Sequence, residues 1–205
     1  MGDIAVTVAI RIGLGAALLT LVSPLQAAPV DTAGASRCET RAYLNDPDPK
    51  GTNVRAAPNG KAAVIGQLPP RAPMPGDDSE IVGVEFEIAG SKDGWLLVHN
   101  PDRGSFKGPG WIYGGLVSGT IGGRQLLASP AGNAKVLAEL HHAGETGVGP
   151  DSFEVMQVHA CQGRFVEVTI RLAPSIAPYP GLPKQPMRGW VRKLCSTQLT
   201  TCDPS

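Results

Sequence analysis

The sequence lacks an excess of charge of either sign, with 18 basic and 18 acidic residues among its 205. Proteins that bind nucleic acid or anionic membranes need clustered Lys and Arg, and no basic cluster is present. Few long segments are free of glycine or proline, which number 26 and 19, so long helices are not expected. Short β-branched runs lie between these residues, which predicts an all-β fold class.

Motifs of catalysis and of phosphate or metal binding are also missing. The chain has no Gly-x-Ser-x-Gly elbow of a hydrolase, and the glycine-rich residues 119–123 lack the Lys-Ser/Thr pair of a phosphate loop. Residues 46–51 imitate a calcium loop, but Lys50 stands where a metal ligand is needed. We therefore expect a protein that is not an enzyme and that has neither a cofactor nor a metal site.

Residues 1–28 have the pattern of a secretory signal peptide. An uncharged apolar run over residues 12–22 is followed by Ser23-Pro24, which disfavours a helix, and then by the small residues Ala27 and Ala28. We expect cleavage near these alanines, which leaves a periplasmic or secreted chain without a membrane span. The alternative is a retained anchor, because about 20 apolar residues can cross a bilayer.

The four cysteines are expected to form two disulfides, since an even number in an exported chain is typical of a disulfide framework. The short separation of Cys195 and Cys202 favours their pairing, which leaves Cys38 with Cys161. The two crossed pairings remain alternatives, and a zinc site is disfavoured because no Cys-x-x-Cys pair exists. His159 and Cys161 share one face of a predicted strand, but oxidation of Cys161 would exclude a Cys–His nucleophile pair.

The chain after the signal peptide is expected to hold a linker and two modules, over residues 29–37, 38–121 and 122–205. The modules form a diverged internal repeat, whose segments occur in the same order in both copies. Pro58 matches Pro130, and Phe165 stands where the first copy has Trp95. The paired segments are 54–58 with 126–130, 64–68 with 136–140, 93–98 with 162–168, and 110–112 with 189–191.

The first copy carries four segments that occur together in one known family. They are Asn53-Val54-Arg55-Ala56-Ala57-Pro58, Val64-Ile65-Gly66-Gln67-Leu68, Asp93-Gly94-Trp95 and Gly110-Trp111-Ile112. In this order they resemble the Asn-Val-Arg-x-x-Pro opening, Val-Ile-Gly strand, Asp-Gly-Trp turn and closing Gly-Trp-Val of the bacterial SH3 domain. The second copy resembles a degenerate member, because it lacks the Asn-Val-Arg opening. The resemblance implies two small SH3-like β-barrels in tandem.

The same resemblance implies a ligand groove in the first module. Its candidate contacts are Trp95, Trp111, Arg55 and Tyr113, and its implied ligand is peptidoglycan or a cell-envelope protein. The alternative interpretation makes Trp95 and Trp111 plugs at the barrel end, a place that suits a large apolar ring with one polar N–H. Arg55 would then be a surface ion-pair partner.

Residues 173–186 form a proline-rich segment with five prolines around Tyr179. Prolines at this density hold the backbone extended. The segment is either a variable hairpin loop or an interaction arm with Tyr179 and Leu182 as its contacts. An interaction arm would support an alternative function, in which the chain is an inhibitor or immunity-type partner of an exported enzyme.

Overall fold

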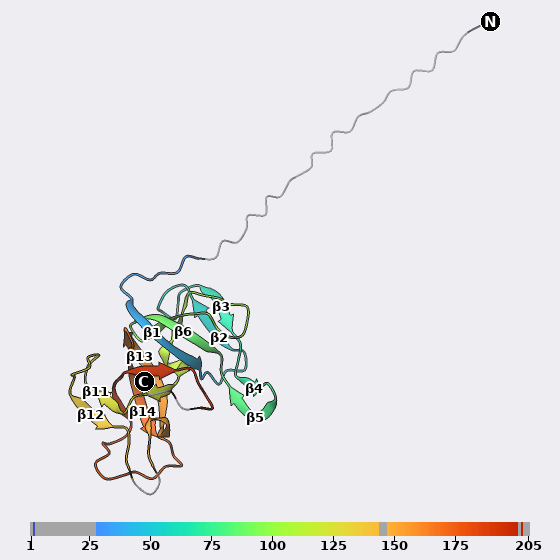
Figure 1. Ribbon diagram of the computed structural model, residues 1–205. Coiled ribbons are helices and arrows are strands. Elements are labelled where there is room, and N and C mark those ends of the chain that lie inside the picture. Colours follow the sequence, from blue (N-terminus) through green and yellow to red (C-terminus); the bar gives the residue numbers. More distant parts are fainter. Residues whose placement is uncertain (1, 3–27, 144–146, 201, 203–205) are drawn as a thin grey trace.

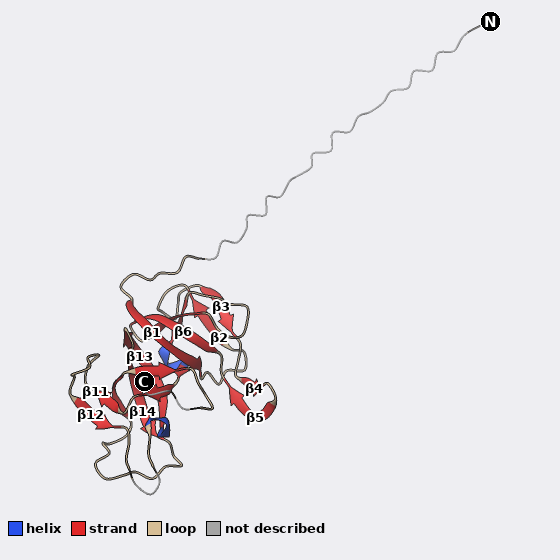
Figure 2. Ribbon diagram, viewed as in Figure 1, coloured by secondary structure: helices blue, strands red, loops and turns tan. Residues whose placement is uncertain are grey.

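The computed structural model describes Gly2, residues 28–143, residues 147–200 and Cys202 (Figure 1). Except for Gly2 and Ala28, the predicted signal peptide lies outside these residues. Within them, no helix has the length and apolar character needed to cross a membrane. Helical structure in the described chain is limited to two short 3-10 turns, η1 (Gly114–Leu116) and η2 (Pro150–Ser152) (Figure 2).

The first module contributes a seven-stranded antiparallel sheet with the order β3-β2-β8-β7-β6-β1-β9. Its inward side chains alternate with outward ones, as strand geometry requires, and the inward ones are large and apolar. The strands are β1 (Ser36–Leu44), β2 (Thr52–Arg55), β3 (Val64–Leu68), β6 (Glu85–Lys92), β7 (Trp95–His99), β8 (Gly110–Tyr113) and β9 (Val117–Ser118).

The second module contributes a five-stranded antiparallel sheet with the order β12-β11-β15-β14-β13. Two ribbons complete the fold, and one of them, β4 with β5, projects from the body of the protein (Figure 1). The remaining strands are β11 (Gln125–Leu127), β12 (Val136–Glu139), β13 (Phe153–Gln162), β14 (Phe165–Leu172), β15 (Met187–Val191), β4 (Ala72–Met74), β5 (Asp77–Val82), β10 (Thr120–Gly122) and β16 (Lys193–Cys195).

The all-β expectation is confirmed, but the strand pairing does not close either sheet into the expected barrel. Strands β3 and β9 end the first sheet, β12 and β13 end the second, and among the described residues these edge strands do not pair with each other. The edge of β13 is covered instead by the first module. The Ser118 hydroxyl donates to the Val155 carbonyl at 2.9 Å, and the Cys161 N–H donates to Ser91 Oγ at 2.8 Å. A covered edge cannot recruit a strand from another molecule.

The sequence repeat coincides with a repeat of strand order and register. The order β3-β2-β8-β7-β6 in the first sheet corresponds to β12-β11-β15-β14-β13 in the second. Each β2–β3 type pair carries a bulge at the same place, after Val54 in one copy and after Leu126 in the other. Arg55 faces Trp111 as Leu127 faces Trp190, so the register can be followed residue by residue.

The two sheets share one hydrophobic core, which contains buried residues of both modules. The expected disulfides are both present, Cys38–Cys161 with a Cα–Cα distance of 5.6 Å and Cys195–Cys202 with one of 5.7 Å. The first ties β1 to the end of β13 and so crosses between modules. Two disulfides indicate an oxidising, extracytoplasmic environment.

The predicted linker is not a free connection. The Asp31 N–H donates to the Ala56 carbonyl at 2.8 Å, and Lys92 Nζ donates to the Ala33 carbonyl at 2.8 Å. Strand β1 already begins at Ser36. The segment packs here because the large Trp111 ring needs a cover and its indole N–H needs an acceptor, which Asp31 supplies through its carbonyl oxygen at 2.8 Å.

Candidate ligand-binding site

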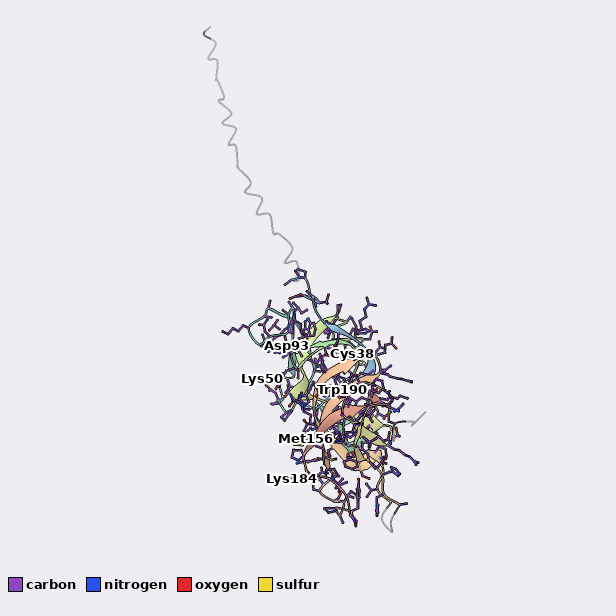
Figure 3. The ribbon with its side chains drawn as sticks, turned by 90° about the vertical axis from the view of Figure 1, so that its left-hand side faces the viewer. Cys38, Lys50, Asp93, Met156, Lys184 and Trp190 are labelled. Atoms are coloured by element: carbon purple, nitrogen blue, oxygen red, sulfur yellow. A yellow bond between two sulfur atoms is a disulfide. The ribbon has the colours of Figure 1, made fainter. Side chains whose placement is uncertain are left out.

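Three of the four predicted groove residues line one pocket of the first module. Arg55, Trp95 and Tyr113 face a hollow of about 220 Å³, whose other wall is formed by the loop that leads from β1 to β2. Lys50 of that loop and Asp93, which precedes the Trp95 strand, lie on the same side of the protein in Figure 3. Larger hollows of about 680, 570, 450 and 370 Å³ in the described chain contain none of the four predicted groove residues.

The aromatic wall of the pocket is set by a tight turn and by strand register. Asp93 and Gly94 have φ values of 51° and 80°, which suit the two-residue turn that joins β6 to β7 and places Trp95 first in β7. Trp95 pairs directly with Tyr113, and the ring centroids lie 5.8 Å apart at an angle of 60°. Cross-strand aromatic pairs of this kind hold each other in place.

Gly115 completes the aromatic wall from the other side of Tyr113. A Cβ atom at position 115 would lie 2.5 Å from Cε1 of Tyr113, so only glycine leaves room for the ring in its observed position. The Tyr113 side chain nevertheless remains 44% exposed. The pair therefore presents a fixed and accessible aromatic corner.

The opposite wall is a loop that Asp46 and Asp48 organise. Asp46 is 8% exposed and accepts hydrogen bonds from the Asp48 N–H at 3.0 Å and from the Thr52 hydroxyl. Asp48 is exposed and accepts from the Lys50 N–H at 2.9 Å. These carboxylates shape the turn that leads into β2. Their role in lining the pocket was missed, although Asp46 and Asp48 precede the motif strand by only a few residues.

Arg55 lies at the rim with a fixed side chain. Its Nη1 donates to the Ala62 carbonyl at 2.8 Å, across the turn between β2 and β3. The alternative prediction of a surface ion pair finds no support within the described residues, where every ion pair involves other side chains. The remaining guanidinium donors can face a ligand in the pocket.

Trp111 does not belong to the pocket, so its assignment as a ligand contact was wrong. Its side chain is 0% exposed, Leu97 faces it on β7, and its indole N–H is bonded to Asp31. The sequence could not reveal this, because the residues that cover Trp111 come from the segment interpreted as a linker. Of the two tryptophans, only Trp95 is accessible.

Tyr179 and Leu182 do not form a free arm. Tyr179 Oη donates to the Glu139 carbonyl at 2.6 Å, and its ring stacks on His142 with centroids 4.9 Å apart. Burial, with Glu139 nearby, raises the pKa of the phenol. Ile176, Tyr179 and Leu182, each three residues apart, pack against the core. Lys184 of the same loop lies at the far end of the protein from Cys38 (Figure 3).

The His159–Cys161 pair has no nucleophile. Cys161 is bonded to Cys38, and His159 Nε2 shares a hydrogen bond of 2.8 Å with Thr169 Oγ1. Burial and then the nearby Arg188 lower the pKa of His159, while Glu167 opposes this shift. The imidazole therefore takes up a proton less readily than a free histidine side chain.

No known protein family, curated protein or solved structure matches the chain. The pocket must therefore be interpreted from its own geometry and chemistry.

Proposed function

We propose that the chain is an exported, non-catalytic binding protein made of two modules of the bacterial SH3 type. In this proposal the first module binds peptidoglycan, or a protein associated with it, in the cell envelope. The single observation that carries the proposal is the aromatic corner of Trp95 and Tyr113 beside Arg55 in one pocket. Exposed aromatic rings with a few convergent polar groups are the usual composition of a ligand site.

The pocket is organised before any ligand arrives. Trp95 and Tyr113 contact each other, Gly115 leaves room for the tyrosine, and Arg55 is bonded to Ala62. Side chains that are already ordered lose little conformational entropy on binding. Their contacts with a ligand therefore contribute more fully to the binding free energy.

The second module lacks the equivalent site. The shared register places Leu127 at the position of Arg55, Phe165 at that of Trp95 and Arg192 at that of Tyr113. In addition, β10 and β11 are separated by only two residues, so no loop forms an opposite wall. We therefore assign ligand binding to the first module and a supporting role to the second.

Co-sedimentation of the exported chain with purified bacterial sacculi tests the proposal. The wild-type chain is expected to pellet, and a Trp95→Ala/Tyr113→Ala double variant with an unchanged circular dichroism spectrum is expected to stay in solution. Phe165→Ala is the matched control, since it removes the equivalent ring of the second module and should leave pelleting unchanged. Failure of the wild type to pellet, or equal pelleting of the double variant, would contradict the proposal.

A further inference from the structure

The pocket lining holds a buried carboxylate, Asp46, that forms no ion pair within the described residues. Asp46 is 8% exposed and lines the hollow. It accepts hydrogen bonds from two neutral groups, the Thr52 hydroxyl and the Asp48 N–H. The described ion pairs all go to other carboxylates. A buried charge is normally paired, because desolvation of an isolated carboxylate is costly.

A second carboxylate and the aromatic corner surround the same space. Asp48 is exposed at the pocket and accepts one backbone hydrogen bond, from Lys50, so most of its acceptor capacity is open. Trp95 and Tyr113 form the facing wall, and aromatic faces attract cations through their quadrupole. The pocket therefore combines carboxylate charge with aromatic faces, two features that favour the same kind of ligand group.

The one cation in the lining does not cancel this preference. Arg55 is held at the rim by its bond to the Ala62 carbonyl, and it forms no ion pair with Asp46 or Asp48. Asp46, Asp48 and Arg55 together leave an excess of one negative charge in the lining. A ligand carboxylate at the floor would meet two anions, and a neutral group would leave Asp46 without a counter-charge.

We propose that this pocket binds a primary ammonium group on an alkyl chain. The three N–H donors of the ammonium would reach Asp46 and Asp48, while the methylene groups lie against Trp95 and Tyr113. The hollow of about 220 Å³ has room for such a chain, since it is many times the cavity volume that a single ordered water needs. This inference rests on the proposed function, because it names the chemical group through which envelope material enters the site.

Titration of the exported chain with Nα-acetyl-lysine amide tests the inference, with the indole NMR signal of Trp95 as readout. We expect saturable binding that moves this signal, and at least tenfold weaker binding of the neutral Nε-acetylated analogue. Asp46→Asn and Asp48→Asn should each weaken binding about tenfold, and Trp95→Leu about fivefold, the last measured by titration calorimetry because this variant lacks the reporting indole. Asp77→Asn, a carboxylate change on the projecting ribbon, is the control and should bind like the wild type.

Asp48→Asn keeps the inference testable if Asp46→Asn fails to fold, because the Asp48 side chain is exposed and, within the described residues, accepts a single hydrogen bond, from the Lys50 N–H. Wild-type affinity in Asp48→Asn would overturn the inference whether or not Asp46→Asn folds. Equal binding of the acetylated analogue would also overturn the inference. If millimolar calcium displaced the probe as effectively as free lysine amide does, the inference would be wrong and the pocket would be a metal site.

Sacculi whose amino groups have been acetylated identify the source of the ammonium group. Loss of pelleting with acetylated sacculi places the amine on the wall peptide, whereas unchanged pelleting with retained lysine amide binding places it on a soluble or protein-borne amine. If pelleting depends on Trp95 but lysine amide does not bind, the ammonium inference is wrong and wall binding stands. If lysine amide binds but the chain does not pellet with untreated sacculi, the ammonium inference stands and wall binding is wrong.

Discussion

The two modules have the same strand order and register, yet they differ at almost every position that could contact a ligand. Both carry a bulge after the equivalent of Val54 and a tryptophan at the equivalent of Trp111. The first adds a loop with two carboxylates, the Trp95–Tyr113 pair and a covering N-terminal segment, whereas the second has none of these at the equivalent positions. Backbone pairing thus maintains the fold, and a few side chains and one loop decide whether the fold has a pocket.

A large effect is expected from the two equivalent tryptophans. Trp111 is fully buried under the segment around Asp31, whereas Trp190 is partly exposed and its indole N–H has no hydrogen-bond partner among the described residues. Trp111→Ala should lower the free energy of unfolding by about 3–5 kcal/mol, and Trp190→Ala by about half as much. Urea unfolding measures both, and equal losses would show that the N-terminal segment does not stabilise the first module.

The two disulfides should also contribute unequally to the free energy of unfolding, with the larger contribution from the one that involves the first module. Cys38–Cys161 closes 123 residues and joins the modules, whereas Cys195–Cys202 closes seven near the C-terminus. In the chain-entropy account a longer loop gives more stabilisation, about 4–5 kcal/mol for the first and about 2–3 kcal/mol for the second. Cys38→Ala/Cys161→Ala and Cys195→Ala/Cys202→Ala variants, unfolded in urea without reductant, test this order. A larger loss in the second variant would mean that strain or local contacts dominate.

The sequence predicted the parts of this comparison that depend on local spacing. Turn residues and β-branched runs gave the all-β class, and the repeat aligned Phe165 with Trp95 in the register that the strands adopt. The preferred disulfide pairing was also predicted correctly, because Cys195 and Cys202 are close in sequence. Each of these signals lies within a short stretch of chain, where residue order limits the possible geometry.

The errors all concern contacts between segments that are distant in sequence. Trp111 is buried because Asp31 lies across it, 80 residues away in the chain, and Tyr179 faces inward because Glu139 and His142 receive it. Periodicity within a strand tells which residues share a face but not what covers that face. Open sheet edges were missed for a similar reason, since barrel closure depends on pairing between the first and last strands.

The smallest expected effect is a pH dependence that only the second module carries. His159 lies on β13 where the register places Ala89 on β6, so the first module has no histidine there. The pKa of His159 is lowered in the folded protein from the ordinary value of 6.5, first by burial and then by Arg188. The unfolded chain therefore binds a proton more readily than the folded one, and stability present above about pH 6.5 is lost as the pH falls through the folded pKa.

The variant His159→Gln, which can keep the bond to Thr169, should reduce the loss of unfolding free energy between pH 7 and pH 5. The matched change in the first module, Ala89→Ser, should leave this loss as in the wild type. Because carboxylates titrate in both proteins, the informative quantity is the difference between wild type and His159→Gln. A difference that does not change with pH would show that the imidazole is solvated in the folded state and that the two modules respond alike to acid.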